Sequence, residues 1–150
     1  MAIKVALDTN VLLDLLLEGR PHKAAAEWIL SAAESGRFML QITTQSIIDA
    51  AYTTRKQKMD AKTFVESIDR LRSFVQITAV DWIDLSWSVS NTQYGSSGDF
   101  EDDAQIANAY NSLCDFFITR DKKLLNLNRE DCPLMIISPG SFIAEMAVRK

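Results

Sequence analysis

The sequence has few cysteines, prolines, glycines and histidines: 2 Cys, 3 Pro, 5 Gly and a single His among 150 residues. Two cysteines, Cys114 and Cys132, are too few for the disulfide framework of a small secreted protein, and their spacing is not that of a metal site. We expect them to be a buried small hydrophobe and a loop thiol. His22 follows Gly-Arg-Pro in a predicted turn, so we expect it at the surface.

Long apolar runs and an excess of basic residues are also missing. Acidic residues interrupt the apolar N-terminal region at Asp8 and Asp14, and no run approaches the roughly 18 apolar residues of a transmembrane helix. We therefore expect no signal peptide, no membrane segment and a cytoplasmic location. The net charge of -4 argues against a protein that wraps nucleic acid on a broad basic surface.

The composition is that of an ordinary globular protein, with 47% hydrophobic and 24% charged residues. We expect one domain over residues 1–150, because this length buries roughly 70% of the unfolded surface.

Short apolar segments alternate with capping residues and amphipathic segments along the chain. The strands are predicted at 2–7, 38–42, 74–80, 116–119 and 135–137. Helices are predicted directly after residue 8, within 21–36, through 47–52 after a cap within 43–46, from 61 to 71, from 82, from 100 to 113, near 124–125 and from about 141, with a loop at 94–98. This alternation predicts an α/β fold, with helices on both faces of a parallel sheet and a ligand site at the carboxyl ends of the strands.

Two aspartates follow predicted strands closely. Asp8 directly follows the first strand and Asp121 comes almost directly after the 116–119 strand. Either one alone could be an ordinary helix N-cap. Together they are expected at the same edge of the sheet.

An acidic segment opens the helix from residue 100. At about 100° per residue, one face of this helix carries the apolar residues Phe100, Ile106, Ala107, Tyr110, Leu113 and Cys114 and is expected to be buried. Asp99 and Asp103 project within this apolar face, and Asp102 lies at its border. A carboxylate on an apolar face is costly unless it is paired or bound to a cation. Glu101 is expected on the solvent side, as are Gln105, Asn108, Asn111 and Ser112.

Asp49 interrupts the apolar series Ile47, Ile48, Ala50, Ala51 near the start of its helix, where the helix dipole also favours a carboxylate. Gathering four or more carboxylates raises their pKa values and opposes folding unless a cation is present. An all-oxygen set favours Mg²⁺ or Mn²⁺, and such an ion can activate water for attack on a phosphodiester.

Three segments resemble the PIN-domain family, especially its VapC-like toxin ribonucleases: residues 5–14 (VALDTNVLLD), 99–105 (DFEDDAQ) and 118–121 (ITRD). The resemblance implies a three-layer α/β/α sandwich with a mainly parallel sheet. It also implies a Mg²⁺ or Mn²⁺ site, endoribonuclease activity on structured RNA such as transfer RNA, an antitoxin partner and a homodimer.

The resemblance also implies roles for individual residues. The catalytic acids are Asp8, Asp49, Asp102 and Asp121. The metal ligands are Asp8, Asp102 and Asp121, with Asp103 and Asp99 as further or water-mediated ligands, and Asn10 and Thr119 support the site by hydrogen bonds. The family usually has Glu where this chain has the shorter Asp49, and the motif favours Asp102 where the helical face favours Asp103.

Substrate contacts are expected from basic residues. Arg55 and Lys56 could hold an RNA backbone or form a plain solvated helix end. Arg20 and Arg120 could meet a phosphate, or Arg120 could pair with a neighbouring aspartate. The tryptophans, Trp28, Trp82 and Trp87, could stack on bases, but they are expected in the core or at an interface.

Other functions stay open at this point. The chain could be a PIN-like housekeeping nuclease, or a catalytically weak domain that binds a metal and a protein partner. A phosphatase of the haloacid dehalogenase type also begins with a strand followed by Asp, but it needs a second acid two residues later, where this chain has Asn10.

Overall fold

The centre of the molecule is a parallel sheet whose strands lie in the order β3-β2-β1-β4-β5. The computed structural model describes residues 2–90, 97–127 and 132–149. Within them the strands are β1 (Lys4–Leu7), β2 (Met39–Thr43), β3 (Val75–Thr78), β4 (Phe116–Ile118) and β5 (Met135–Ile137). Each predicted strand is confirmed, with ends that differ by a few residues.

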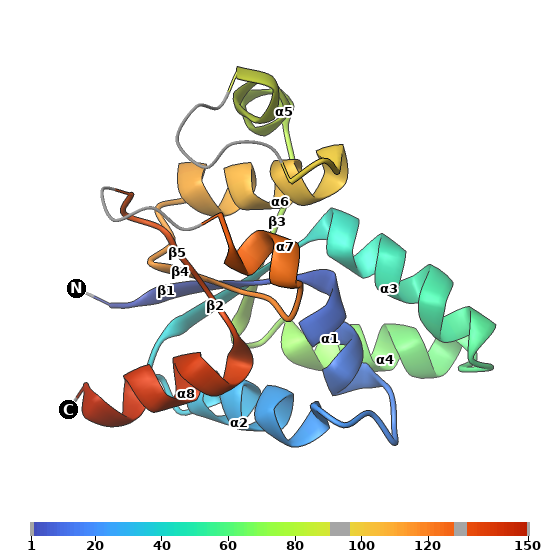
Figure 1. Ribbon diagram of the computed structural model, residues 1–150. Coiled ribbons are helices and arrows are strands. Elements are labelled where there is room, and N and C mark those ends of the chain that lie inside the picture. Colours follow the sequence, from blue (N-terminus) through green and yellow to red (C-terminus); the bar gives the residue numbers. More distant parts are fainter. Residues whose placement is uncertain (1, 91–96, 128–131, 150) are drawn as a thin grey trace.

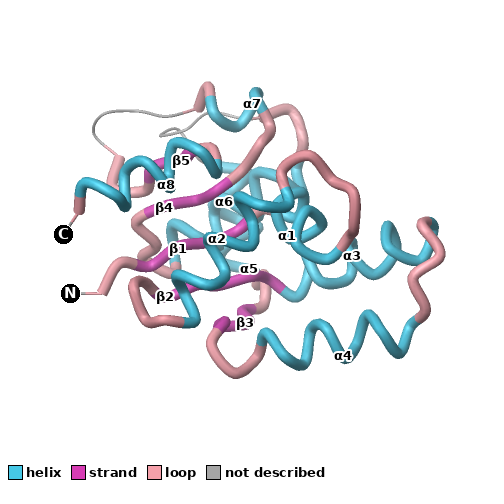
Figure 2. The backbone as a smooth tube through the Cα atoms, turned by 90° about the horizontal axis from the view of Figure 1, so that it is seen from below, coloured by secondary structure: helices cyan, strands magenta, loops and turns pink. Residues whose placement is uncertain are grey.

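Helices cover both faces of this sheet, as predicted (Figure 1). One face carries α1 (Thr9–Leu16), α2 (Lys23–Glu34), α3 (Thr44–Lys56), α4 (Ala61–Leu71) and α8 (Pro139–Val148). The other face carries α5 (Trp82–Ser90), α6 (Phe100–Asn111) and α7 (Lys122–Leu125). Figure 2 shows the strands side by side, with β5 at one edge of the sheet and β3 at the other. The predicted α/β/α sandwich is confirmed, and its sheet is wholly parallel in the described residues.

Side-chain caps explain where most of the helices begin. Asp8, Thr43, Asp60, Asp99 and Asp121 each accept a hydrogen bond from a backbone N–H of the first helical turn. The closing helix begins at Pro139, slightly before the predicted start, because Ser138 caps it and proline suits the first helical turn. Most of the loop predicted at 94–98 lies outside the described residues.

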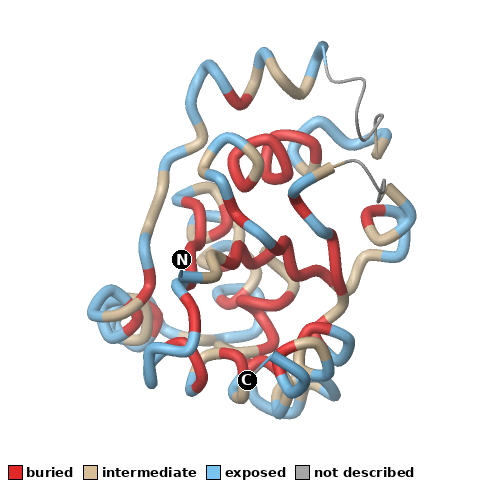
Figure 3. The backbone as a smooth tube through the Cα atoms, turned by 90° about the vertical axis from the view of Figure 1, so that its left-hand side faces the viewer, coloured by how far each residue is buried: buried red, intermediate tan, exposed pale blue. Residues whose placement is uncertain are grey.

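The sheet has a core on each side. Val5, Phe117 and Ile118 are at most 1% exposed, because β1 and β4 are central strands with both faces covered. Figure 3 shows buried backbone through the strands and α6, while α5 above them is mostly exposed. Trp28 and Trp87 pack partly buried against the two cores, but Trp82 is 77% exposed.

The cysteines and the histidine lie largely where the composition led us to expect them. Cys114 is buried and Cys132 is partly buried, and both are free thiols. His22 is exposed, as expected. No helix in the described parts of the chain combines the length and apolar character needed to cross a bilayer.

The strand order places a topological switch point between β1 and β4. From β1 the chain moves outward through β2 to β3, then returns to build β4 and β5 on the other side of β1. Connections diverge from the carboxyl ends of β1 and β4, and ligands in such sheets bind in the resulting crevice. The Asp8 amide donates to the Ile118 carbonyl at 2.9 Å, so the two strand ends are fixed together at this point.

Candidate active site

A cavity of about 280 Å³ opens at this edge of the sheet. Its lining comes from the starts of α1, α3, α6 and α7. The residues that line it are Asp8, Thr9, Asn10, Leu13, Asp49, Glu101, Asp102, Gln105 and Asp121. All four predicted catalytic aspartates therefore lie around one cavity.

Asp8 is the most constrained of these carboxylates. It is 6% exposed, and its Oδ1 accepts a hydrogen bond from the Thr9 amide at 2.7 Å. Its Oδ2 accepts from Thr119 Oγ1 at 2.6 Å and from Asn10 Nδ2 at 3.0 Å. Burial raises the pKa of Asp8 above its ordinary value, although the Thr119 and Thr9 hydrogen bonds lower it in part. Asn10 and Thr119 hold Asp8 in the way that the sequence predicted.

Asp121 reaches the cavity through the end of β4. Leu7 pairs with Ile118 in the sheet, so Asp8 and Thr119 leave their strands side by side. Thr119 Oγ1 accepts from the Asp121 amide at 3.0 Å while it donates to Asp8. One hydroxyl group thus fixes the backbone of Asp121 relative to the carboxylate of Asp8.

The acidic start of α6 presents its three aspartates differently. Asp99 caps the helix, with Oδ1 accepting from the amides of Glu101 and Asp102. Asp103 is buried and accepts from the Ser97 amide at 2.9 Å. Of the three, only Asp102 lines the cavity, so direct contact of Asp99 and Asp103 with a bound ion stays a prediction. Burial, followed by repulsion from Asp8, raises the pKa of Asp102 to about 6.

Glu101 is exposed, as expected, but it also lines the cavity. It lies against Asp49 in the cavity, and a hydrogen bond to Asp49 is the main reason that its pKa rises to about 7. Asp49 Oδ1 accepts from Gln45 Nε2 at 3.1 Å, whereas the described residues offer no amide or hydroxyl donor to its buried Oδ2. A carboxyl group can donate to a carboxylate only when it is protonated, so this pair shares a proton or needs a cation.

These carboxyl groups fit a hard divalent cation. The cavity is lined by the five carboxyl groups of Asp8, Asp49, Glu101, Asp102 and Asp121, and the residues around it include no histidine or cysteine. Such oxygen donors favour Mg²⁺ or Mn²⁺ over zinc. The buried Oδ2 of Asp49 lacks a hydrogen-bond donor, and the pKa values of Asp102 and Glu101 are raised. A bound cation would stabilise the charged form of these carboxylates.

The side chains are spread around the cavity. In the described residues no group of three or more His, Cys, Asp or Glu side chains lies close enough together to hold an ion. Mutual repulsion of carboxylates favours this separation. Binding of an ion therefore requires these side chains to turn toward it.

The predicted basic contacts fall into two groups. Arg20 and Arg120 both bind Asp14, which is 1% exposed: Arg20 Nε and Arg120 Nε lie at 2.7 and 2.6 Å from its carboxylate. This pairing was the alternative considered for Arg120. Arg55 and Lys56 are exposed in the last turn of α3, roughly 9–10 Å along the helix axis from Asp49.

The structure places Gln105 and Asn108 differently from the prediction. Both were expected on the solvent side of α6, yet they are 3% and 4% exposed. Their amides bind polar groups of neighbouring elements, as Gln105 does with Thr43 and Ser46. Gln105 and Asn108 are three residues apart and share one side of α6, but this spacing does not indicate that the side is turned inward.

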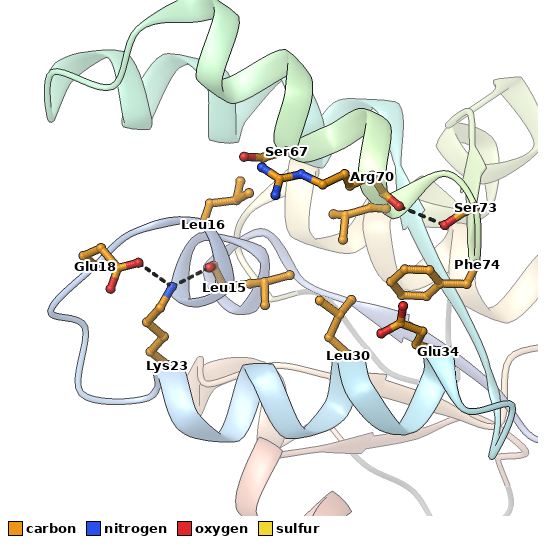
Figure 4. Close-up of a pocket in the computed structure, with 11 residues that line it drawn as sticks. Leu15, Leu16, Glu18, Lys23, Leu30, Glu34, Ser67, Arg70, Ser73 and Phe74 are labelled. Atoms are coloured by element: carbon orange, nitrogen blue, oxygen red, sulfur yellow. Dashed lines mark hydrogen bonds and ion pairs between the residues drawn. The ribbon is translucent and has the colours of Figure 1, made fainter.

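A larger hollow of about 590 Å³ lies away from the cavity, between α1, α2 and α4 (Figure 4). Its wall combines leucines and Phe74 with polar side chains. Lys23 donates to the Leu15 carbonyl and pairs with Glu18. None of the predicted catalytic acids lines this hollow. The chemistry of the site is therefore assigned to the smaller cavity.

Comparison with known proteins agrees with this geometry. The family model described as PIN domain matches residues 4–123. No curated protein matches the sequence.

Several solved structures share the fold. VapBC2 from Rickettsia felis, bound to a DNA fragment from its promoter, has a TM-score of 0.67 at 14% identity, over 91% of this chain and 98% of that chain. A toxin–antitoxin complex from Klebsiella pneumoniae has a TM-score of 0.63 at 20% identity, over 90% and 97%. The toxin VapC20 of Mycobacterium tuberculosis, which cleaves the sarcin–ricin loop, has a TM-score of 0.59 at 14% identity, over 80% and 92%.

Proposed function

The chain belongs to the PIN-domain family, and on that premise we propose that it is an endoribonuclease that hydrolyses phosphodiester bonds in RNA with Mg²⁺ or Mn²⁺. The observation that carries the proposal is the convergence of Asp8, Asp49, Asp102 and Asp121 on one cavity at the carboxyl ends of β1 and β4. RNA phosphates would be repelled by so many carboxylates, so a cation is also needed for the substrate to approach.

Asp8, Asp102 and Asp121 are the residues that would hold the cation. When bound, the ion supplies positive charge that activates water and stabilises the transition state of phosphodiester hydrolysis. Thr119 and Asn10 orient Asp8 through its Oδ2, whereas Oδ1 accepts only the Thr9 amide and keeps a lone pair for a ligand. The Asp49–Glu101 pair lines the same cavity and is placed to accept a proton from the attacking water.

The decisive experiment is cleavage of a structured RNA by the purified protein with Mg²⁺, with Mn²⁺ and with a chelator. Cleavage is expected only with the ions, and Asp8→Asn and Asp121→Asn should lower it at least a hundredfold without unfolding the chain. Asp69→Asn is the matched control, because Asp69 is an exposed aspartate of α4, away from the cavity. Cleavage in chelator, or full activity in both cavity variants, would refute the mechanism.

We further propose that the chain is the toxin of a toxin–antitoxin pair. The support is its likeness to a VapC toxin and to chains of two toxin–antitoxin complexes. Expression of the wild type should arrest growth, expression of Asp8→Asn should not, and a partner protein should copurify from the native source. Free protein without growth arrest would favour a housekeeping nuclease.

We also propose that the chain forms a homodimer. Ile48 and Tyr52 are each 63% exposed and lie four residues apart on one side of α3. Such exposure is unusual for a monomer when the side chains gather in one patch. Light scattering should give twice the chain mass for the wild type and a lower mass for Ile48→Ser with Tyr52→Ser.

A further inference from the structure

A network of uncharged polar groups lies beneath the carboxylates. Gln105 is its centre, with a side chain that lines the cavity although the residue is only 3% exposed. Thr43 and Ser46 are its main partners, and they are 4% and 0% exposed. Buried polar groups of this kind are stable only when their hydrogen bonds are made.

The hydrogen bonds of this network are specific. Thr43 Oγ1 donates to Gln105 Oε1 at 2.8 Å, and Gln105 Nε2 donates to Ser46 Oγ at 3.1 Å. Ser46 Oγ also accepts from Thr9 Oγ1 at 2.9 Å. The Gln105 side chain therefore bonds to one hydroxyl group through its oxygen and to another through its nitrogen. The second hydroxyl, that of Ser46, also binds Thr9 of α1.

Three members of the network lie within one helical turn of a cavity carboxylate in the sequence. Thr9 follows Asp8, and Ser46 precedes Asp49 by three residues on α3. On α6, Gln105 follows Asp102 by three residues and Glu101 by four, so the three lie on one side of the helix. The network consequently joins the elements that bring the acids together.

We propose that Gln105 is a positioning residue of the candidate active site: its hydrogen bonds to Thr43 and Ser46 fix α6 against α3 and α1, and so set the spacing of Asp102 and Glu101 from Asp8 and Asp49. The inference rests on the proposed function, because the spacing matters only if these acids act on a common ligand. Carboxylates repel one another, and an uncharged network holds their helices together without adding to that repulsion.

The test is Mn²⁺ binding by calorimetry with the full chain, beside RNA cleavage. Gln105→Met keeps the length of the side chain and removes both hydrogen bonds. Loss of a group that orients ligands typically costs 10–100-fold in metal affinity or activity. We expect Mn²⁺ binding to weaken about tenfold and kcat to fall about tenfold, with KM for RNA within about twofold of the wild type.

The matched control is Asn111→Ala. Asn111 lies on the same helix, and its amide donates to Asp84 of α5 at 2.9 Å, away from the cavity. This variant loses an interhelical amide hydrogen bond, so its melting temperature is expected to fall, whereas its Mn²⁺ affinity and kcat should match the wild type. If Gln105→Met lowers only the melting temperature, the role is structural and the inference is overturned.

Ser46→Ala provides a second variant if Gln105→Met does not fold. It removes the acceptor shared by Gln105 and Thr9 and leaves the bond from Thr43 to Gln105, so a loss in the same direction is expected. The double variant should lose less than the product of the single losses, because both act through one network; multiplicative losses would overturn the inference. If the wild type binds Mn²⁺ but cuts no RNA, the proposed function fails, while the Mn²⁺ comparison still decides the role of Gln105.

Discussion

Replacing Asp102 by asparagine should stabilise the protein in the absence of divalent metal at pH 8. Asp102 is partly buried among Asp8, Asp99, Asp103 and Asp121, whose charges repel its carboxylate. Asparagine has nearly the same shape and no charge. Unlike Asp8, Asp102 is not held by Thr9, Asn10 or Thr119, so those hydrogen bonds stay in the variant.

The magnitude follows from the raised pKa. Burial and repulsion raise the pKa of Asp102 from 3.8 to about 6, and each unit corresponds to about 1.4 kcal/mol. The upper bound is therefore about 3 kcal/mol. Solvent screening reduces this for a partly exposed group, so we expect about 1 kcal/mol, or 2–4 °C in melting temperature for a chain of about this length.

The sign of the pH dependence is a stringent part of this prediction. A carboxyl group with a raised pKa in the folded state binds its proton more tightly there than in the unfolded chain. Its stabilising contribution is full below about pH 4 and is lost as the pH rises through about 6. Asp102→Asn does not lose stability in this way. The difference in free energy of unfolding between the variant and the wild type should therefore be largest at pH 8 and should nearly vanish near pH 4.

Urea denaturation at several pH values, with and without Mg²⁺, measures these effects. Saturating Mg²⁺ should make the wild type more stable than Asp102→Asn at pH 8, because an ion at 100 times its Kd stabilises the folded wild type by about 2.7 kcal/mol. Asp69→Asn, on exposed α4, should follow the wild type throughout. The reasoning is refuted if Asp102→Asn is no more stable than the wild type at pH 8 without metal, or if its advantage does not shrink with acid.

Three further predictions concern neighbouring groups. Asp14→Asn leaves two partly buried arginines without their carboxylate, so the free energy of unfolding should fall by about 2–3 kcal/mol in urea titrations. Thr119→Val removes the 2.6 Å hydrogen bond to Asp8, so the pKa of Asp8 should rise, and Mn²⁺ binding measured against pH should require a higher pH. Asp49→Asn removes the carboxylate beside Glu101, so the pKa of Glu101, followed by NMR, should fall from about 7 toward 4.5; an unchanged value would contradict the pairing.

The sequence contains most of the information about the fold. Continuous apolar strands, each followed by a capping residue, predict a parallel α/β sandwich because burial on both faces requires apolar residues throughout a strand. Asp8 and Asp121 could be paired for the same reason. Carboxyl ends of parallel strands share one edge, so position after a strand is enough to bring them together.

Helix α6 shows where the hydrophobic periodicity of the sequence was not sufficient to predict which side chains are buried. Gln105 and Asn108 are polar, so periodicity placed them in solvent, while Phe100 and Leu113 were placed on the buried face. The structure reverses this: Phe100 is 55% and Leu113 83% exposed, and the two amides are buried. Hydrogen-bond partners from α3, α5 and the sheet make burial of the amides favourable, and these partners are distant in the sequence.

By itself, the sequence determined the identity of the acids and the edge of the sheet where they gather, because strand ends and caps are local properties of the chain. The tertiary structure alone decided that Asp102, rather than Asp99 or Asp103, lines the cavity with Glu101 beside Asp49. The rotation of α6 depends on long-range bonds from Gln105 and Asn108 to other elements, and no local pattern contains that information.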